Sequence, residues 1–295
     1  MKHIFFAGCL LAISTIAIAQ TPAAKILYGA ITKENLATAP YDQWFDSSYE
    51  AYKPNADIIN SIKKLNAKDI SVQVFMGTWC GDSRREVPRF LKLANDLGWS
   101  ENNVKIIAVG GSDSLYKQSP QGEDAGKGIF RVPVFIIYKN GVEINRITEF
   151  PAYSLERDLL AILSGKEYNS NYRSFPVIRN WLANGILSDK NNSSRGLAMQ
   201  LKPLVGGENE LNSLAYLLLK QQRKQEALKV FLINANLYPE SANVFSSLGE
   251  GYLKNGDNKN AVVYLERALD LNKDPKMLKD ILSLLYEAKR EAVSF

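Results

Sequence analysis

Apolar residues between positions 24 and 163 fall into short runs separated by polar turns, a pattern typical of alternating strands and helices. Asn55 is suited to cap the helix that follows it, and the Lys139-Asn140-Gly141 run is typical of a hairpin turn. The order of the expected elements is a strand, a helix, a second strand, a hairpin and a last helix. This order predicts a compact α/β unit, with helices covering both faces of a mixed sheet. The expected strands are 24–31, 70–76, 104–109, 132–138 and 142–148, and the expected helices are 41–52, 56–64, 84–97, interrupted near Pro88, and 155–163.

After Gly165 the pattern predicts helices alone, starting with 176–183, capped by Ser174, and 197–204. Farther on, similar residues recur 34 positions apart: Leu214 and Leu248, Ala215 and Gly249, Leu218 and Tyr252, Ala227 and Ala261, Phe231 and Leu265. The alanines and the glycine in this set are small enough to let paired helices approach closely. This part resembles tetratricopeptide repeats, most clearly over 208–273, which implies stacked helix pairs and a last helix over 277–292. The repeats either buttress the α/β unit or form a groove for a partner protein.

The N-terminal residues predict an export signal. A short basic start precedes the apolar run 4–18, and Ala17-Ile18-Ala19 fits a cleavage site before Gln20. The run is too short to span a membrane. A lipid anchor at Cys9 fits less well, because most of the apolar run follows that cysteine. We expect a signal peptide at 1–19, an α/β domain at 20–165 and a helical domain at 166–295. The signal predicts export to the periplasm or envelope of a bacterium. We expect no transmembrane segment in the mature chain.

Composition narrows the possible chemistry. The net charge of +5 is spread over scattered basic residues, so no nucleic acid partner is indicated. The only histidine, His3, leaves with the signal, which excludes Ser-His-Asp and Cys-His catalysis and a histidine-ligated metal. Neither a metal nor a cofactor is indicated. Cys9 leaves too, so the mature chain has one thiol, Cys80, and no internal disulfide.

That thiol lies in the run Trp79-Cys80-Gly81-Asp82-Ser83, between the apolar stretch 72–77 and the amphipathic segment 84–97. A cysteine between a strand and a helix has its sulfur aimed at free backbone N–H groups and at the positive end of the helix dipole, which favours a thiolate. Arg84 and Arg85 act in the same direction, and Asp82 opposes them. The alternative is a buried cysteine that only packs.

Several features of residues 24–165 occur in one order: the run 74–83, Pro88 one turn later, Arg131-Val132-Pro133-Val134 at the start of a strand, and the Lys-Asn-Gly hairpin. Together they resemble the thioredoxin superfamily. The resemblance implies a thioredoxin fold, with Cys80 as catalytic nucleophile and Pro133 as a cis-proline beside it. It also implies that the substrate chain binds at Trp79, Gly81, Asp82, Val132 and Pro133.

Two positions depart from that family. Ser83 stands where disulfide reductases have a second, resolving cysteine, and Val74 stands where many thioredoxins have a buried acid. Cys80 could therefore form a mixed disulfide with a disulfide-bearing or thiol-bearing client, but an external thiol would have to release it. Ser83 is expected to hydrogen-bond the sulfur as the second member of the catalytic pair.

Two hypotheses remain. The first is an exported monothiol enzyme of thiol-disulfide exchange. The second is a redox-inactive scaffold whose helical repeats recruit a partner protein. The segment 112–128 is longer than a tight link requires, and it either faces the substrate or is a solvated crossover.

Overall fold

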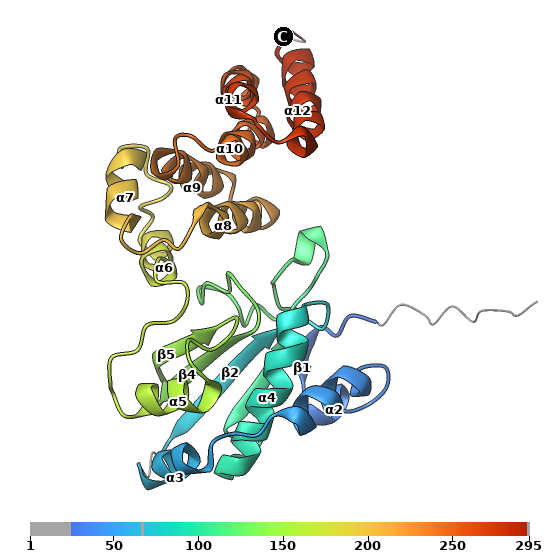
Figure 1. Cartoon of the computed structure of the whole chain (residues 1–295), viewed down its shortest axis with the longest axis vertical. Helices are drawn as coiled ribbons and strands as arrows, with labels where there is room; N and C mark the ends of the chain where they lie inside the picture. The colour runs from blue at the N-terminus through green and yellow to red at the C-terminus, as the bar shows by residue number, and fades with distance from the viewer. Residues whose placement is uncertain (1–24, 66–67, 294–295) are drawn as a thin grey trace, which may run out of the picture.

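The computed structural model describes residues 25–65 and 68–293, so the expected signal peptide at 1–19 lies outside the described residues. The chain forms an α/β part followed by a helical part that lies beyond one end of the sheet (Figure 1). Among the described residues, all five strands lie before position 149, and the chain after position 149 contains helices and no strand.

The sheet has five strands in the order β1-β3-β2-β4-β5. Strands β2 and β3 are parallel, and the other neighbouring pairs are antiparallel. The predicted bounds of β2 and β5 are confirmed to the residue, because each strand is a clear apolar run bounded by turns. The strands are β1 (Gly29–Ile31), β2 (Ile70–Met76), β3 (Val104–Ala108), β4 (Val134–Lys139) and β5 (Val142–Thr148).

Helices α2 to α5 pack on one face of the sheet. Their buried side chains form a single cluster with alternate strand residues, among them Val72, Val74 and Phe135. Asn55 caps α3 as expected, because its side chain accepts hydrogen bonds from the N–H groups of Asp57 and Ile58. The helices are α1 (Lys33–Leu36), α2 (Asp42–Ala51), α3 (Ala56–Lys64), α4 (Gly81–Leu97) and α5 (Leu155–Leu163).

The expectation of helices on both faces is wrong for this sheet. On the second face, Phe75, Val134 and Ile136 are buried with residues of the connection from β3 to β4, not with α2–α5. That connection contains only the short 3-10 helix η1 (Asp113–Leu115). Three of its glycines, at positions 122, 126 and 128, have positive φ angles, which an α-helix does not accommodate.

Helix α4 also differs from the prediction. It begins at Gly81, not at position 84, and it continues through Pro88 without a break. The earlier start makes Cys80 its N-cap residue. The same helix buries Val87, Phe90 and Leu93 in the core, and this packing holds it together across the proline.

The helical part consists of α6 to α12. At the positions that recur in the sequence, Ala215, Ala227 and Ala261 are fully buried, and a Cβ atom on Gly249 would lie 2.5 Å from the side chain of Leu265. Small residues therefore set the closest approach of the paired helices, as expected. The helices are α6 (Phe175–Ala183), α7 (Ser194–Leu201), α8 (Glu208–Lys220), α9 (Lys224–Leu237), α10 (Ala242–Lys254), α11 (Asn258–Leu271) and α12 (Pro275–Val293).

In the part of the chain that the structure covers, none of the helices combines the length and the apolar character that crossing a membrane requires.

The two parts meet next to the start of β4. The ring of Phe130 lies edge-to-face against Phe175, with 5.2 Å between ring centroids, and belongs to the apolar core of the helical part. Arg131 donates a 2.6 Å hydrogen bond to the hydroxyl of Ser213 in α8. The segment that precedes β4 is thus anchored by the helical part.

Candidate functional site

Cys80 stands between the end of β2 and the start of α4. Its backbone is extended, with φ −94° and ψ 125°, and its carbonyl accepts the first helical hydrogen bond from Arg84 N at 3.0 Å. Its own N–H donates to the carbonyl of Gly77 at 2.9 Å, which closes the turn. The residue is half-buried and packs against the apolar cluster around Phe75.

The sulfur contacts a segment more than fifty residues away. Its S–H group donates to the carbonyl of Val132 at 3.2 Å, and the peptide bond between Val132 and Pro133 is cis. Both of these residues are buried. The structure therefore brings together Cys80, Val132 and Pro133, as expected. The sulfur does not accept a capping hydrogen bond from the first turn of α4, although the sequence predicted that contact.

Trp79 is fixed by two glycines and a carbonyl. Its indole N–H donates to the carbonyl of Val109 at 3.2 Å. A Cβ atom on Gly77 would lie 2.5 Å from the indole ring, and one on Gly111 would lie 2.7 Å from it. The ring also packs on Tyr116, with 5.1 Å between centroids. The sequence analysis did not predict Gly111 and Tyr116 for the site. The pair of glycines that follows β3 is the feature of the sequence that could have indicated a close approach of the chain there.

The expected contact between Ser83 and the sulfur is wrong. Ser83 is fully buried, and its hydroxyl accepts a 3.2 Å hydrogen bond from the N–H of Gly77. The physical reason is the early start of α4, which turns Ser83 toward the end of β2. Ser83 supports the turn that carries Cys80, and it offers the sulfur no hydrogen bond.

The other residues of the motif lie at the surface. Gly81 is exposed, and Asp82 is half-buried and forms an ion pair with Arg85 at 2.8 Å. The guanidinium of Arg84 donates to the carbonyl of Thr78 at 2.6 Å, which ties the first turn of α4 to the loop before it. Both arginines are therefore occupied by nearby acceptors.

Lys117 brings a buried amine to this region. Only 6% of the residue is exposed, and its Nζ donates to the carbonyl of Phe130 at 2.8 Å. Burial lowers the pKa of Lys117 from its ordinary value of 10.5 to about 8, and the Arg131 guanidinium acts in the same direction. Glu149 and Cys80 oppose this shift. Sequence reasoning missed Lys117, because a lysine in a polar loop carries no signal of burial.

The backbone around Lys117 is constrained as well. Its φ angle is +58°, a conformation that few residues with a side chain adopt. Two backbone hydrogen bonds hold the loop in place: Lys117 N to the Gly110 carbonyl at 2.9 Å, and Gly110 N to the Gln118 carbonyl at 2.9 Å. The loop thus delivers the amine into the interior instead of leaving it in solvent.

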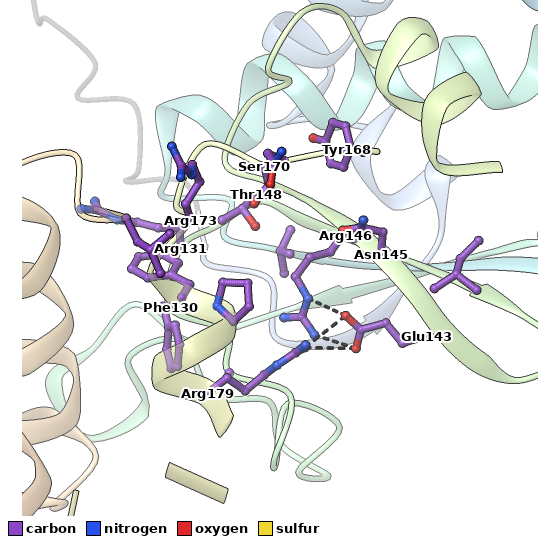
Figure 2. Close-up of a pocket in the computed structure, with 17 residues that line it drawn as sticks. Phe130, Arg131, Glu143, Asn145, Arg146, Thr148, Tyr168, Ser170, Arg173 and Arg179 are labelled. Carbon is purple, nitrogen blue, oxygen red and sulfur yellow. Dashed lines mark hydrogen bonds and ion pairs between the residues drawn. The ribbon is translucent and has the colours of Figure 1, made fainter. Parts of the chain in front are cut away.

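A pocket of about 470 Å³ lies between β5, the chain after α5, and α6 (Figure 2). Cys80 does not line it. Three of its four arginines bind groups of the protein: Arg146 and Arg179 both contact the carboxylate of Glu143, at 2.8 and 3.1 Å, and Arg131 pairs with Glu149 at 3.6 Å. The pair between Arg179 of α6 and Glu143 of β5 joins the helical and α/β parts, so we interpret the pocket as part of their junction.

Within the described residues, no three His, Cys, Asp or Glu side chains gather where they could hold a metal ion.

No protein-family model, curated protein or solved structure matches this chain. Its function has to be inferred from the geometry of the site.

Proposed function

We propose that this protein is a thioredoxin-like thiol-disulfide exchange protein that uses Cys80 as its only nucleophile. The observation that supports this most is a half-buried thiol at the N-cap of α4, in contact with the carbonyl that precedes a cis-proline. A helix N-terminus favours a negatively charged sulfur, and the exposed fraction of the side chain leaves room for attack.

The client is proposed to be a protein that carries a disulfide. The Cys80 thiolate attacks one sulfur of that disulfide, so that a bond forms between Cys80 and the client and the client's own S–S bond breaks. The electron pair leaves on the second client sulfur, which takes a proton from water. An external thiol, having lost its proton to water, then attacks the client sulfur of the mixed disulfide. A disulfide forms between the external thiol and the client, the bond to Cys80 breaks, and Cys80 leaves as a thiolate.

Residues around the sulfur would dock the client chain. Trp79 provides a rigid apolar surface, and Val132 with Pro133 provides backbone beside which an extended peptide can lie. Gly81 and Asp82 form the rim where the client approaches. The 34-residue repeats after position 208 are proposed to be tetratricopeptide-like and to recruit a partner protein, and residues 1–19 are proposed to direct export to the periplasm or cell envelope.

The alternative function is a redox-inactive scaffold. The hydrogen bond from the Cys80 S–H to a carbonyl favours it, because a carbonyl accepts a proton from a thiol but cannot donate one to a thiolate. A groove of about 440 Å³ on α8, α10 and α12, lined by Tyr216, Glu250 and Asp280, would be the place where the repeats hold a partner.

Alkylation of the purified protein with iodoacetamide tests the proposal. Free cysteine reacts increasingly as pH approaches its pKa of about 8.5. We expect Cys80 in the folded protein to react well below that pH, and to form a mixed disulfide with a small aromatic disulfide. Cys80→Ser is the control and should give neither product. A thiol that reacts only after unfolding in urea would leave the scaffold as the function.

A further inference from the structure

We propose that Lys117 is a positioning residue for the reactive thiol: its buried ammonium group supplies the positive charge that holds Cys80 as a thiolate. This inference rests on the proposed exchange function and deepens it, since it names the group that regulates the nucleophile. The residue comes from the connection between β3 and β4, outside the Trp79–Ser83 motif.

The two side chains bind the same short stretch of backbone. Lys117 Nζ donates to the carbonyl of Phe130, and Cys80 Sγ donates to the carbonyl of Val132, two residues later. Two residues of chain span at most about 7 Å, so the two carbonyls lie within that distance of each other, and the amine and the sulfur lie 2.8 and 3.2 Å from them. The amine and the sulfur are therefore close enough for an electrostatic interaction, and Cys80 is one of the groups that act on the pKa of Lys117.

The carboxylate of Glu149 balances the charge on Lys117 only in part, without an ion pair between the two. Its amine forms no ion pair in the part of the chain that the structure covers; its partners there are the Phe130 carbonyl and the ring of Tyr116, whose centroid is 4.9 Å away. A buried ammonium without a counter-ion is costly, and a protein retains one where a negative charge forms nearby. The thiolate of Cys80 is such a charge.

Other charged groups also act on the amine of Lys117, and none of them takes over its role beside the thiol. Glu149 and a charged Cys80 raise the pKa of Lys117, whereas Arg131 and Lys220 lower it. Of the two acids, Glu149 is already bound to Arg131 at 3.6 Å. A residue with a pKa of about 8 is still mostly protonated at pH 7, so the charge is present under neutral conditions.

The position of Lys117 also explains the long connection that contains it. A solvated crossover would leave its lysines exposed, yet this one is buried and its backbone has a positive φ angle. Phe130, whose carbonyl holds the amine, packs in the core of the helical part. The helical part therefore helps to fix the distance between the amine and the thiol.

Lys117→Met tests the inference, with Lys127→Met as the matched control. Both lysines lie in the same connection, but Lys127 is half-buried and donates to the carbonyl of Glu123. We expect Lys117→Met to slow alkylation of Cys80 at pH 7 about tenfold, because the variant lacks the positive charge that favours the thiolate. Lys127→Met should leave the rate unchanged, and Lys117→Arg should restore most of the rate.

A second measurement does not depend on a lysine variant. Coupling between two groups is reciprocal, so a thiolate that is stabilised by the ammonium must also stabilise the ammonium. The pKa of the Lys117 amine, followed by NMR of the side chain, should fall in Cys80→Ser relative to the unaltered protein.

The outcomes separate this inference from the proposed function. If the unaltered thiol reacts well below the pH of free cysteine, but Lys117→Met reacts at the same rate and Cys80→Ser leaves the amine unchanged, the role of Lys117 is overturned and the exchange function stands. If the unaltered thiol reacts only on unfolding, the exchange function fails, and the inference fails with it.

Discussion

Buried polar groups serve different purposes in the two parts of this molecule. In the helical part three neutral side chains bind one another: Asn234 donates to Asn212 at 2.9 Å, and Asn212 donates to Ser247 at 3.1 Å. The buried carboxylate of Glu210 there accepts a hydrogen bond from the hydroxyl of Ser174. In the α/β part, the buried amine of Lys117 donates to the carbonyl of Phe130 and stays mostly charged at pH 7, because its pKa is about 8. Neutral, mutually bound groups specify how helices pack, whereas buried amines with a lowered pKa occur both in functional sites and in structural networks.

The largest expected effect comes from giving the site a second thiol. Position 83 is one helical turn from Cys80, a separation at which two cysteines can form a disulfide. Ser83→Cys should therefore gain dithiol reductase activity, which a single cysteine lacks, measured as reduction of a fluorescent disulfide peptide.

Ser83→Ala is the control for that gain, since it removes the hydroxyl that accepts from Gly77 without adding a thiol. A folded Ser83→Cys protein with no reductase activity would argue against a client-docking surface around Cys80.

The next effect concerns stability and pH. The folded-state pKa of Lys117 is about 8 and its ordinary value is 10.5, so between these values the unfolded chain binds more protons and stability rises with pH. The difference of about 2.5 units corresponds to about 3 kcal/mol. Relative to Lys117→Met, the unaltered protein should gain about that much as pH rises from 8 to 10.5.

Urea unfolding of both proteins across this range measures the difference, and subtracting one curve from the other removes the contribution of the tyrosines. Equal pH dependence in the two proteins would mean that the amine is not buried in solution. Together with the alkylation rates, the unfolding data test whether the buried ammonium group of Lys117 lowers the stability of the fold while it promotes the reactivity of the Cys80 thiol.

The smallest effect is expected from a change confined to the helical part. Gly249→Ala places a methyl group against Leu265, with no room for it, and the overpacking outweighs the gain in helix propensity. We expect a net loss of about 1–2 kcal/mol in the free energy of unfolding and an unchanged rate of Cys80 alkylation.

Gly196→Ala in α7 is the matched control, because its nearest neighbour would be 3.8 Å from the new methyl group. It should stabilise the protein by up to about 1 kcal/mol. A change in Cys80 reactivity caused by Gly249→Ala would show that the repeats transmit packing changes to the site, and the contrast between the two parts would weaken.

Much of the candidate site could be predicted, since Trp79, Cys80, Val132 and Pro133 do lie together. The parts that could not be predicted depend on where other segments pack. Ser83 binds Gly77 because α4 begins earlier than its polar pattern suggests. Tyr116 reaches Trp79 from the connection between β3 and β4, which has no periodic pattern.

The sequence by itself determined the features that neighbouring residues control: the bounds of β2, β5 and α5, the cap at Asn55, and the small residues of the repeats. These follow from periodicity and local hydrogen bonding. Only the tertiary structure decided that one face of the sheet lacks a helix from α2–α5, that Val132 contacts the sulfur, and that Lys117 is buried. Such contacts join residues far apart in the chain, and they form only where the whole fold brings the segments together.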